Sequence, residues 1–258
     1  MDFSPSDRDN AVDHQTDSPA QKGHLMSRAL ASALNLWLRS QVTEVGALQL
    51  NIDAGNRQLL SGCVRRVTLS AHKAVYQGLH LSEIALEGEN IRVNLGQMVR
   101  GKPLQLLESV RVAGRVLLLQ GDLDASLTAP LLANGVKEFL VALLRSGDLV
   151  DSSGSDPDLN LQDLQIVLEE GQVLLSASLV SVSGSRSAIA IRTGFELASP
   201  HELRLVNPQW LPHAKAKRGM AIADLNGYTF DLGAETQIQQ LVLEVGQMSC
   251  EARLLVSP

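Results

Sequence analysis

Apolar and polar residues alternate one by one over long stretches of the chain, and this pattern constrains the fold more than any other feature. The first stretch reads ALQLNID from Ala47 to Asp53, and similar alternation returns many times before the C-terminus. A period of two residues places every second side chain on one face of a β-strand, whereas a surface helix needs a period of 3.6. The chain is therefore expected to fold largely as sheet with one apolar face.

The first half of this pattern predicts an antiparallel meander. One parity runs from Val64 to Leu81, and its apolar positions are Val67, Leu69, Ala71, Val75, Leu79 and Leu81. We expect a bend at Gly78, a bulge or turn near Glu83 where the parity changes, and a turn at Gly88. A short strand with Ile91, Val93 and Leu95 should follow. Since the connections are too short for parallel crossovers, neighbouring strands should be antiparallel.

The second half predicts a further set of strands around a loop at residues 146–160. The loop sequence, SGDLVDSSGSDPDLN, is rich in Ser, Asp and Gly. The expected strands are Val110–Leu119 before the loop and Leu161–Glu169, Val173–Val182, Ala188–Leu197, Glu202–Val206, Thr229–Leu232 and Ile238–Val256 after it, the last with a break near Gly246.

Two segments instead carry the helical period. Residues 27–42 start with Ser27 as a candidate N-cap, and their apolar stripe consists of Leu30, Leu34, Trp37, Leu38 and Val42. Residues 122–145 start at Asp122, and their stripe consists of Leu132, Val136, Phe139, Leu140 and Leu143. Because Pro130 lies inside the second segment, we expect either a kink or two helices that meet there.

Length and composition fit one large β-rich domain or two smaller ones. The chain has 258 residues, of which 45% are apolar, so it contains enough apolar material for a core. Residues 1–25 are acidic and polar and are predicted to be a disordered tail. Residues 26–258 are predicted to form one α+β domain, mainly antiparallel β, with a curved sheet wrapped around the amphipathic helices.

Charge and hydropathy narrow the range of partners. The net charge is −6 and no basic stripe with interleaved aromatic residues is present, so nucleic acid is not an expected partner. No apolar run reaches the ~18 residues of a membrane span, and residues 1–23 lack the pattern of a signal peptide. We therefore expect a cytoplasmic protein that contacts the cytoplasmic face of a membrane reversibly. Trp37 fits either that contact or the core, while Cys63 and Cys250 are either two reduced thiols or one bridge.

No catalytic or metal-binding set stands out. The six histidines form no H-E-x-x-H pair and no Cys/His spacing typical of a metal site, and SVSGSRSA from Ser181 to Ala188 contains no G-x-S-x-G elbow. Glu169 and Glu170 precede Gly171 in an expected turn, where paired carboxylates are usually solvated. We therefore expect no cofactor, no metal and no catalytic residue.

The segment GENIRVNLGQMVRGKPLQLLE from Gly88 to Glu108 carries part of the candidate site. Residues 97–100 predict one helical turn that stops at Gly101, with Pro103 just beyond it. The residues expected to line an apolar groove are Leu95, Met98, Val99 and Leu104 from this segment and Leu132, Val136, Phe139 and Leu140 from the second helical segment. The helical turn should close one end of that groove.

Two basic groups accompany the apolar residues. Arg100 and Lys102 should lie at the rim of the groove, either free in solvent or in contact with a lipid phosphate. Lys215, Lys217 and Arg218 are expected on a loop that is either solvated or close to an anionic membrane.

Three stretches resemble a known family. LHLSEIALEGENIRVNLGQMVRGKPLQLLE, DLDASLTAPLLANGVKEFL and NPQWL are similar to the cyanobacterial branch of the LmeA-like family, over roughly Ser27 to the C-terminus. The most specific parts are Gly88-Glu89-Asn90, Gly96-Gln97 and the GKPL that starts at Gly101. The resemblance implies phospholipid binding and a tubular lipid-binding type of fold, in which a curved antiparallel sheet and helices enclose an apolar groove. A mycobacterial relative is associated with phospholipase activity.

Three functions are therefore hypotheses. The first is non-enzymatic binding or transfer of a phospholipid or another apolar lipid in the groove. The second is a phospholipase-like hydrolase that acts on membrane lipids. The third is a structural interaction protein whose groove is filled by its own helices.

Overall fold

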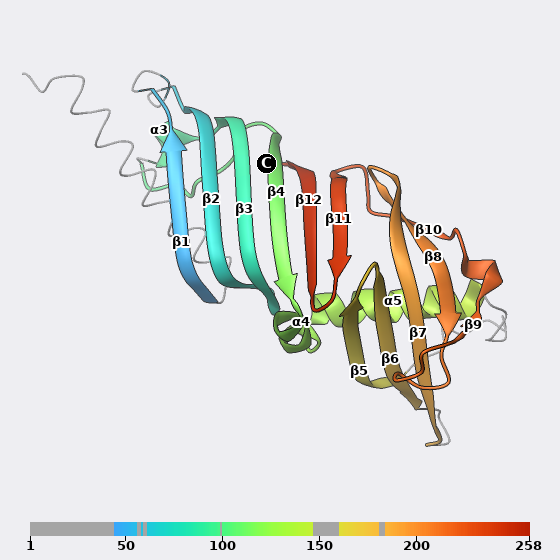
Figure 1. Ribbon diagram of the computed structural model, residues 1–258. Helices are drawn as coiled ribbons and strands as arrows, with labels where there is room; N and C mark the ends of the chain where they lie inside the picture. The colour runs from blue at the N-terminus through green and yellow to red at the C-terminus, as the bar shows by residue number, and fades with distance from the viewer. Residues whose placement is uncertain (1–43, 56–57, 59–60, 99, 147–159, 181–183) are drawn as a thin grey trace, which may run out of the picture.

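Two antiparallel sheets make up most of the protein (Figure 1). The structure is a computed structural model that describes residues 44–55, 58, 61–98, 100–146, 160–180 and 184–258. The first sheet has the strand order β1-β2-β3-β4-β12-β11, and the second has the order β10-β8-β7-β6-β5 with β9 paired to β8. This architecture confirms the prediction of an α+β fold that is mainly antiparallel β.

The elements follow the predicted order closely. They are β1 (Glu44–Asp53), β2 (Cys63–Tyr76), β3 (Leu79–Arg92), α3 (Leu95–Met98), β4 (Val110–Leu119), α4 (Gln120–Ser126), α5 (Pro130–Ser146), β5 (Asn160–Glu169), β6 (Gln172–Val180), β7 (Arg186–Ser199), β8 (Glu202–Trp210), β9 (Met220–Ala221), the 3-10 turn η1 (Ala223–Leu225), β10 (Thr229–Asp231), β11 (Thr236–Glu244) and β12 (Gln247–Val256). Each strand predicted from Val110 onward is present, while the short β9 was not predicted.

The hairpin between β2 and β3 corrects two expectations. Its turn lies at Gln77 and Gly78, whose φ angles are 49° and 82°, and β3 then runs unbroken past Glu83 and Gly88. The expected turn at Gly88 and the expected irregularity near Glu83 are therefore wrong. The alternation of apolar residues gave the wrong turn position because Lys73 has a φ of 52°. Beyond Lys73 the apolar residues of β2 no longer alternate, since the neighbouring Ala74 and Val75 are both buried.

The second helical segment divides at Pro130, which was one of the two expected outcomes. Pro130 is the first residue of α5, where its fixed φ suits a helix and its missing N–H leaves no hydrogen bond unmade. The predicted helix at residues 27–42 lies outside the described residues. The predicted tail and almost all of the predicted loop lie outside them as well.

The first sheet has one apolar and one polar face, because directly opposed residues of antiparallel strands point to the same side. Two cross-strand rows hold only aliphatic residues, glycine and one cysteine; they are Leu48–Ala71–Ile84–Val116–Cys250–Leu241 and Leu50–Leu69–Leu86–Gly114–Ala252–Ile238. We call these the Leu48 row and the Leu50 row, and together the first-sheet apolar face. The opposite face carries exposed ion pairs such as Arg66–Glu89 and Arg115–Glu251.

The second sheet buries one face under α5. Leu140 of α5 is completely buried, and Ile191 and Leu205 of the sheet are each 1% exposed. Phe139 of α5 contacts the rings of Phe195 and Phe230, with centroid distances of 6.5 and 5.3 Å. One cross-strand row on this face reads Ile166–Leu175–Ile191–Trp210–Met220, and we call it the Ile166 row.

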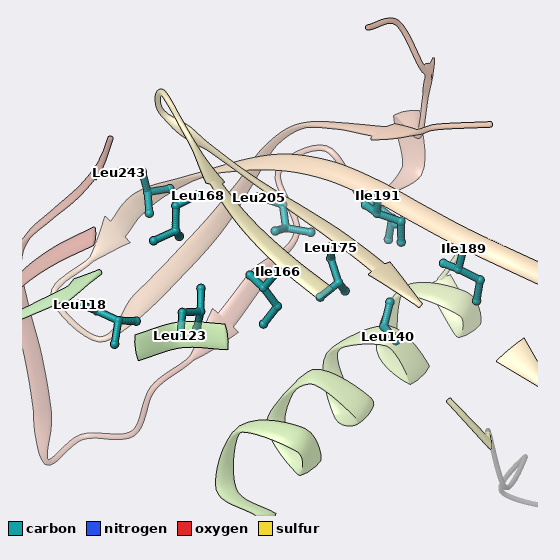
Figure 2. Packing of buried hydrophobic residues seen from close by; sticks show 11 residues of the cluster. Leu118, Leu123, Leu140, Ile166, Leu168, Leu175, Ile189, Ile191, Leu205 and Leu243 are labelled. Atoms are coloured by element: carbon teal, nitrogen blue, oxygen red, sulfur yellow. The ribbon is translucent and has the colours of Figure 1, made fainter. Parts of the chain in front are cut away.

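The two sheets share one core where β11 meets the β5–β6 hairpin. Leu118 and Leu243 of the first sheet belong to the same buried cluster as Ile166 and Leu168 of the second (Figure 2). The Gln120 side chain also joins the sheets, since its Nε2 donates to the Ile166 carbonyl at 2.7 Å and its Oε1 accepts from the Leu168 N–H at 2.9 Å. The apolar face of the first sheet therefore continues onto the second sheet.

Candidate functional site

A hollow of about 240 Å³ lies between α5 and the second sheet. Its wall comes from α5 and its floor from β5, β6 and β7; the lining residues are Leu131, Leu132, Gly135, Val136, Phe139, Ile166, Val173, Leu175, Ile191, Thr193 and Phe195. Gly135 contributes space, because a Cβ built there would meet no atom within 4 Å. The alternation of the strands and the stripe of α5 both point apolar side chains into this space.

The lining offers almost no polar chemistry. Among the described residues that line it, Thr193 is the one polar residue, and its hydroxyl donates to the carbonyl oxygens of Gly194 at 3.0 Å and Val206 at 3.3 Å. The Thr193 hydroxyl therefore already donates its hydrogen bond to the backbone rather than to a ligand. The apolar side chains of such a site suit a hydrocarbon chain.

The volume of the hollow limits the size of the ligand that it can enclose. Pockets for small molecules usually enclose roughly 300–1,000 Å³, so about 240 Å³ suits part of an acyl chain better than a whole phospholipid. A longer ligand must continue onto neighbouring apolar surface.

The first-sheet apolar face provides that surface. Its members are mostly half-buried rather than buried, with Leu50, Leu69 and Leu86 as examples from three adjacent strands. It begins at the junction where Leu118 and Leu243 pack against the second sheet. The hollow and the face therefore adjoin the same apolar core, in which the junction residues Leu118 and Leu243 are 7% and 6% exposed.

The α3 segment lies at the other end of the first-sheet face (Figure 1). Leu95 is 4% exposed and forms a small cluster with Val64 and Val93. Met98 and Leu104 pack against this cluster, and so do Ile52 and Val67, the next residues along β1 and β2 from the Leu50 row. The segment therefore covers one end of the face, while Val99 lies outside the described residues.

Asn94 holds this segment in place. Its backbone N–H and side-chain Oδ1 both pair with Gln105, and its Nδ2 donates to the Pro103 carbonyl at 2.9 Å. Gly101 has a φ of 84°, as expected for the residue that ends a helical turn. Arg100 and Lys102 flank it and are both exposed.

The predicted groove residues therefore fall into two separate groups. Leu132, Val136 and Phe139 line the hollow, and Leu140 from the same helix is fully buried in the core beside it. Leu95, Met98 and Leu104 lie at the far end of the first sheet. The sheet residues that connect the two groups were not predicted as site residues, although their alternation was visible in the sequence.

The paired carboxylates noted in the sequence, Glu169 and Glu170, do not act as a pair in the structure. Glu169 accepts a hydrogen bond from Arg192 Nε at 2.7 Å, so it is a partner of that guanidinium rather than of Glu170. Within the described residues no group of three His, Cys, Asp or Glu side chains could hold a metal ion. The same part of the chain has no helix with the length and apolarity required to cross a membrane.

Cys63 and Cys250 are both free thiols, which is one of the two expected alternatives. Cys250 belongs to the Leu48 row, and burial, with a smaller effect of Glu251, raises the pKa of its thiol. The thiol on the first-sheet face is therefore protonated and weakly nucleophilic at neutral pH.

The fold and site define a β-rich protein with an extended apolar surface suited to lipid chains. A family model described as LmeA-like phospholipid-binding matches residues 24–253, so the chain belongs to that family. Comparisons with curated proteins and with solved structures gave no match.

Proposed function

We propose that this chain binds a phospholipid without hydrolysing it, with acyl chains held in the hollow and along the first-sheet apolar face. The observation that carries the proposal is the hollow beside α5, whose described lining is apolar except for Thr193 and which adjoins the same core as the first-sheet apolar face. Membership of a phospholipid-binding family supports the class of ligand. Transfer between membranes would require only that the bound lipid exchange.

Burial of hydrocarbon supplies the affinity. Each CH₂ group removed from water contributes ~0.8 kcal/mol, so a chain of about 16 carbons contributes roughly 12 kcal/mol. Losses of translational and conformational freedom offset part of this gain. A site of this kind needs little polar recognition, which agrees with the lining observed.

Native mass spectrometry of gently purified protein tests the proposal. We expect the mass of one bound phospholipid, and extraction with organic solvent should remove it. Free fatty acid released during incubation would support the hydrolase instead. A protein that never carries or accepts lipid would support the structural alternative, in which the apolar surface is covered by the chain itself.

We also propose that Arg100 and Lys102 contact the phosphate of the bound lipid. Both side chains are exposed beside the apolar α3 cluster, and ammonium and guanidinium groups form strong charge-assisted hydrogen bonds with phosphate. Arg100→Ala with Lys102→Ala should lower affinity for phospholipid several-fold and leave that for an uncharged diacylglycerol unchanged. The matched control is Arg111→Ala with Arg253→Ala, two exposed arginines of the first sheet. Equal losses in both pairs would remove the phosphate role.

Reversible contact with the cytoplasmic face of a membrane stays a prediction. Cell fractionation with and without high salt tests it, and the expected result is a protein that leaves the membrane fraction as salt increases. Recovery only after detergent extraction would contradict this prediction.

A further inference from the structure

The outer edge of the second sheet, at β9, carries an unusual distribution of charge. From Leu203 to Ala223 the sequence contains Arg204, Lys215, Lys217 and Arg218 but no Asp or Glu. In the whole chain, acidic residues outnumber Lys and Arg by 28 to 22. This edge is therefore a local positive region on an acidic protein.

The basic residues project from an anchored loop. Ala214 and Ala216 pack against a buried cluster formed by Leu174, Ala190 and Leu211, and the Ala216 carbonyl accepts a hydrogen bond from Arg192 at 3.3 Å. Since the alanines point inward, Lys215 and Lys217 point outward and are exposed, as is Arg218. None of these three cations forms an ion pair with another described residue.

An exposed apolar residue follows directly. Met220 is 70% exposed, and it is the outermost member of the Ile166 row. The other members are the partly buried Trp210 and then Ile191, Leu175 and Ile166, which form part of the floor of the hollow. Gly219 permits this arrangement, because a Cβ there would lie 2.6 Å from the Trp210 carbonyl oxygen. An apolar row therefore leads from the hollow to the basic edge.

We propose that the edge formed by Lys215, Lys217, Arg218 and Met220 docks the protein onto an anionic lipid bilayer. This inference rests on the proposed function, because it places the membrane beside the row that leads to the lipid-binding hollow. Cations are attracted to the negative surface potential of such a membrane, and an exposed Met gains by burial among acyl chains. The α3 segment, which Arg100 and Lys102 follow closely in the sequence, lies at the opposite end of the molecule from β9 (Figure 1), so these two residues take no part in this contact.

Co-sedimentation with vesicles of equal parts phosphatidylglycerol and phosphatidylcholine tests the proposal. One Lys or Arg near an anionic surface contributes about fivefold in affinity, so loss of all three cations weakens binding about 100-fold and their reversal to Glu should weaken it by at least that factor. The variant is Lys215→Glu/Lys217→Glu/Arg218→Glu. The control is Lys73→Glu/Arg111→Glu/Arg253→Glu, which changes the net charge equally at exposed positions of the first sheet. We expect the control to lose less than about fivefold, since it lies away from the contact.

A second variant tests the apolar part of the edge. Met220→Ser should weaken vesicle binding about threefold, whereas Met220→Leu should keep it, because only the first removes a side chain that inserts among lipids. Equal vesicle binding by the two triple variants, or no vesicle binding by the unmodified chain, overturns the docking proposal.

A separate measurement keeps the two proposals apart. Uptake of monomeric lysophosphatidylcholine from solution reports on the lipid site and needs no bilayer. The triple variant at the basic edge should take up this lipid as the unmodified chain does, which also shows that it is folded. Failure of the unmodified chain to take up any lipid would overturn the proposed function, and vesicle binding would still decide the docking proposal.

Discussion

The two sheets bury their apolar faces to different extents. In the second sheet, Ile191 and Leu205 are each 1% exposed beneath α5, and Leu140 of α5 is completely buried. In the first sheet, the members of the Leu48 and Leu50 rows are mostly half-buried. Within the described residues, α3 and α4 contact the first sheet only near its two ends.

This difference in burial indicates that the two sheets have different roles. The second sheet has a helical cover of its own and therefore a conventional core, with one hollow left in it. The first sheet presents two aliphatic rows that the described helices cover only near their ends, and apolar faces of this kind often mark a binding surface. We infer that the second sheet stabilises the fold and that the first sheet provides most of the area for the bound lipid.

Truncation of one core residue in each sheet should give the largest effect. Ile191→Ala should lower the free energy of unfolding by about 4 kcal/mol, because a fully buried side chain leaves a cavity. Leu86→Ala should cost only about 1 kcal/mol in lipid-free protein, since its site is already partly open to solvent. Urea denaturation of delipidated protein measures both values. Similar losses at the two sites would show that the first-sheet face is covered as completely as the second.

Asn94→Ala should give the next largest effect, at the α3 end of the first sheet. Removal of its amide leaves the Gln105 N–H and the Pro103 carbonyl without their partner and should cost about 1–3 kcal/mol. Asn51→Ala, at an exposed position of β1, is the control and should cost less than about 0.5 kcal/mol. If Asn94→Ala is as mild as its control, the α3 segment is not anchored in the way the hydrogen bonds indicate.

Local signals explain what could be predicted from the sequence. Pro130 at the start of α5, Gly101 after α3 and the strands beyond Val110 each follow from the preferences of a few neighbouring residues. Periodicity also assigned Leu132, Val136 and Phe139 to one side of their helix, and all three line the hollow.

The remaining features depend on contacts between distant segments. The spacing of apolar residues in the sequence does not reveal that the α3 residues lie at one end of the first sheet, or that α5 packs against the second sheet. The floor of the hollow, including Val173 and Phe195, exists because α5 crosses β6 and β7. The pairing of Met220 with Trp210 in β9 is too short to leave a pattern. These residues were therefore missed as members of a site.

Filling the hollow should separate its contribution from that of the first-sheet face. Gly135→Trp places a large ring in the hollow. It should weaken lipid binding about tenfold, since several CH₂ groups of the acyl chain can no longer be buried there. Gly135→Ala is the control; it should stabilise the protein by about 1 kcal/mol through helix propensity and leave binding nearly unchanged. Titration with a fluorescent phospholipid measures both affinities. Undiminished binding by Gly135→Trp would mean that lipid uses the first-sheet face alone.

Thiol modification should give the smallest effect and tests the first-sheet face directly. In a Cys63→Ser variant, only Cys250 on the Leu48 row can react. Because burial raises the pKa of this thiol, the reactive thiolate is scarce at pH 7, and the modification rate should increase as pH rises. Bound phospholipid should slow the reaction several-fold at each pH by covering the sulfur and burying it further.

The reciprocal Cys250→Ser variant provides the control, since Cys63 lies on neither apolar row. Its modification rate should be the same with and without lipid. Protection of both cysteines would indicate a general tightening of the protein rather than coverage of one face. Protection of neither would confine the lipid to the hollow, and the half-buried rows of the first sheet would then require a different partner. Protection of Cys250 alone is the outcome that requires lipid on the first sheet, because Cys250 belongs to the Leu48 row and does not line the hollow.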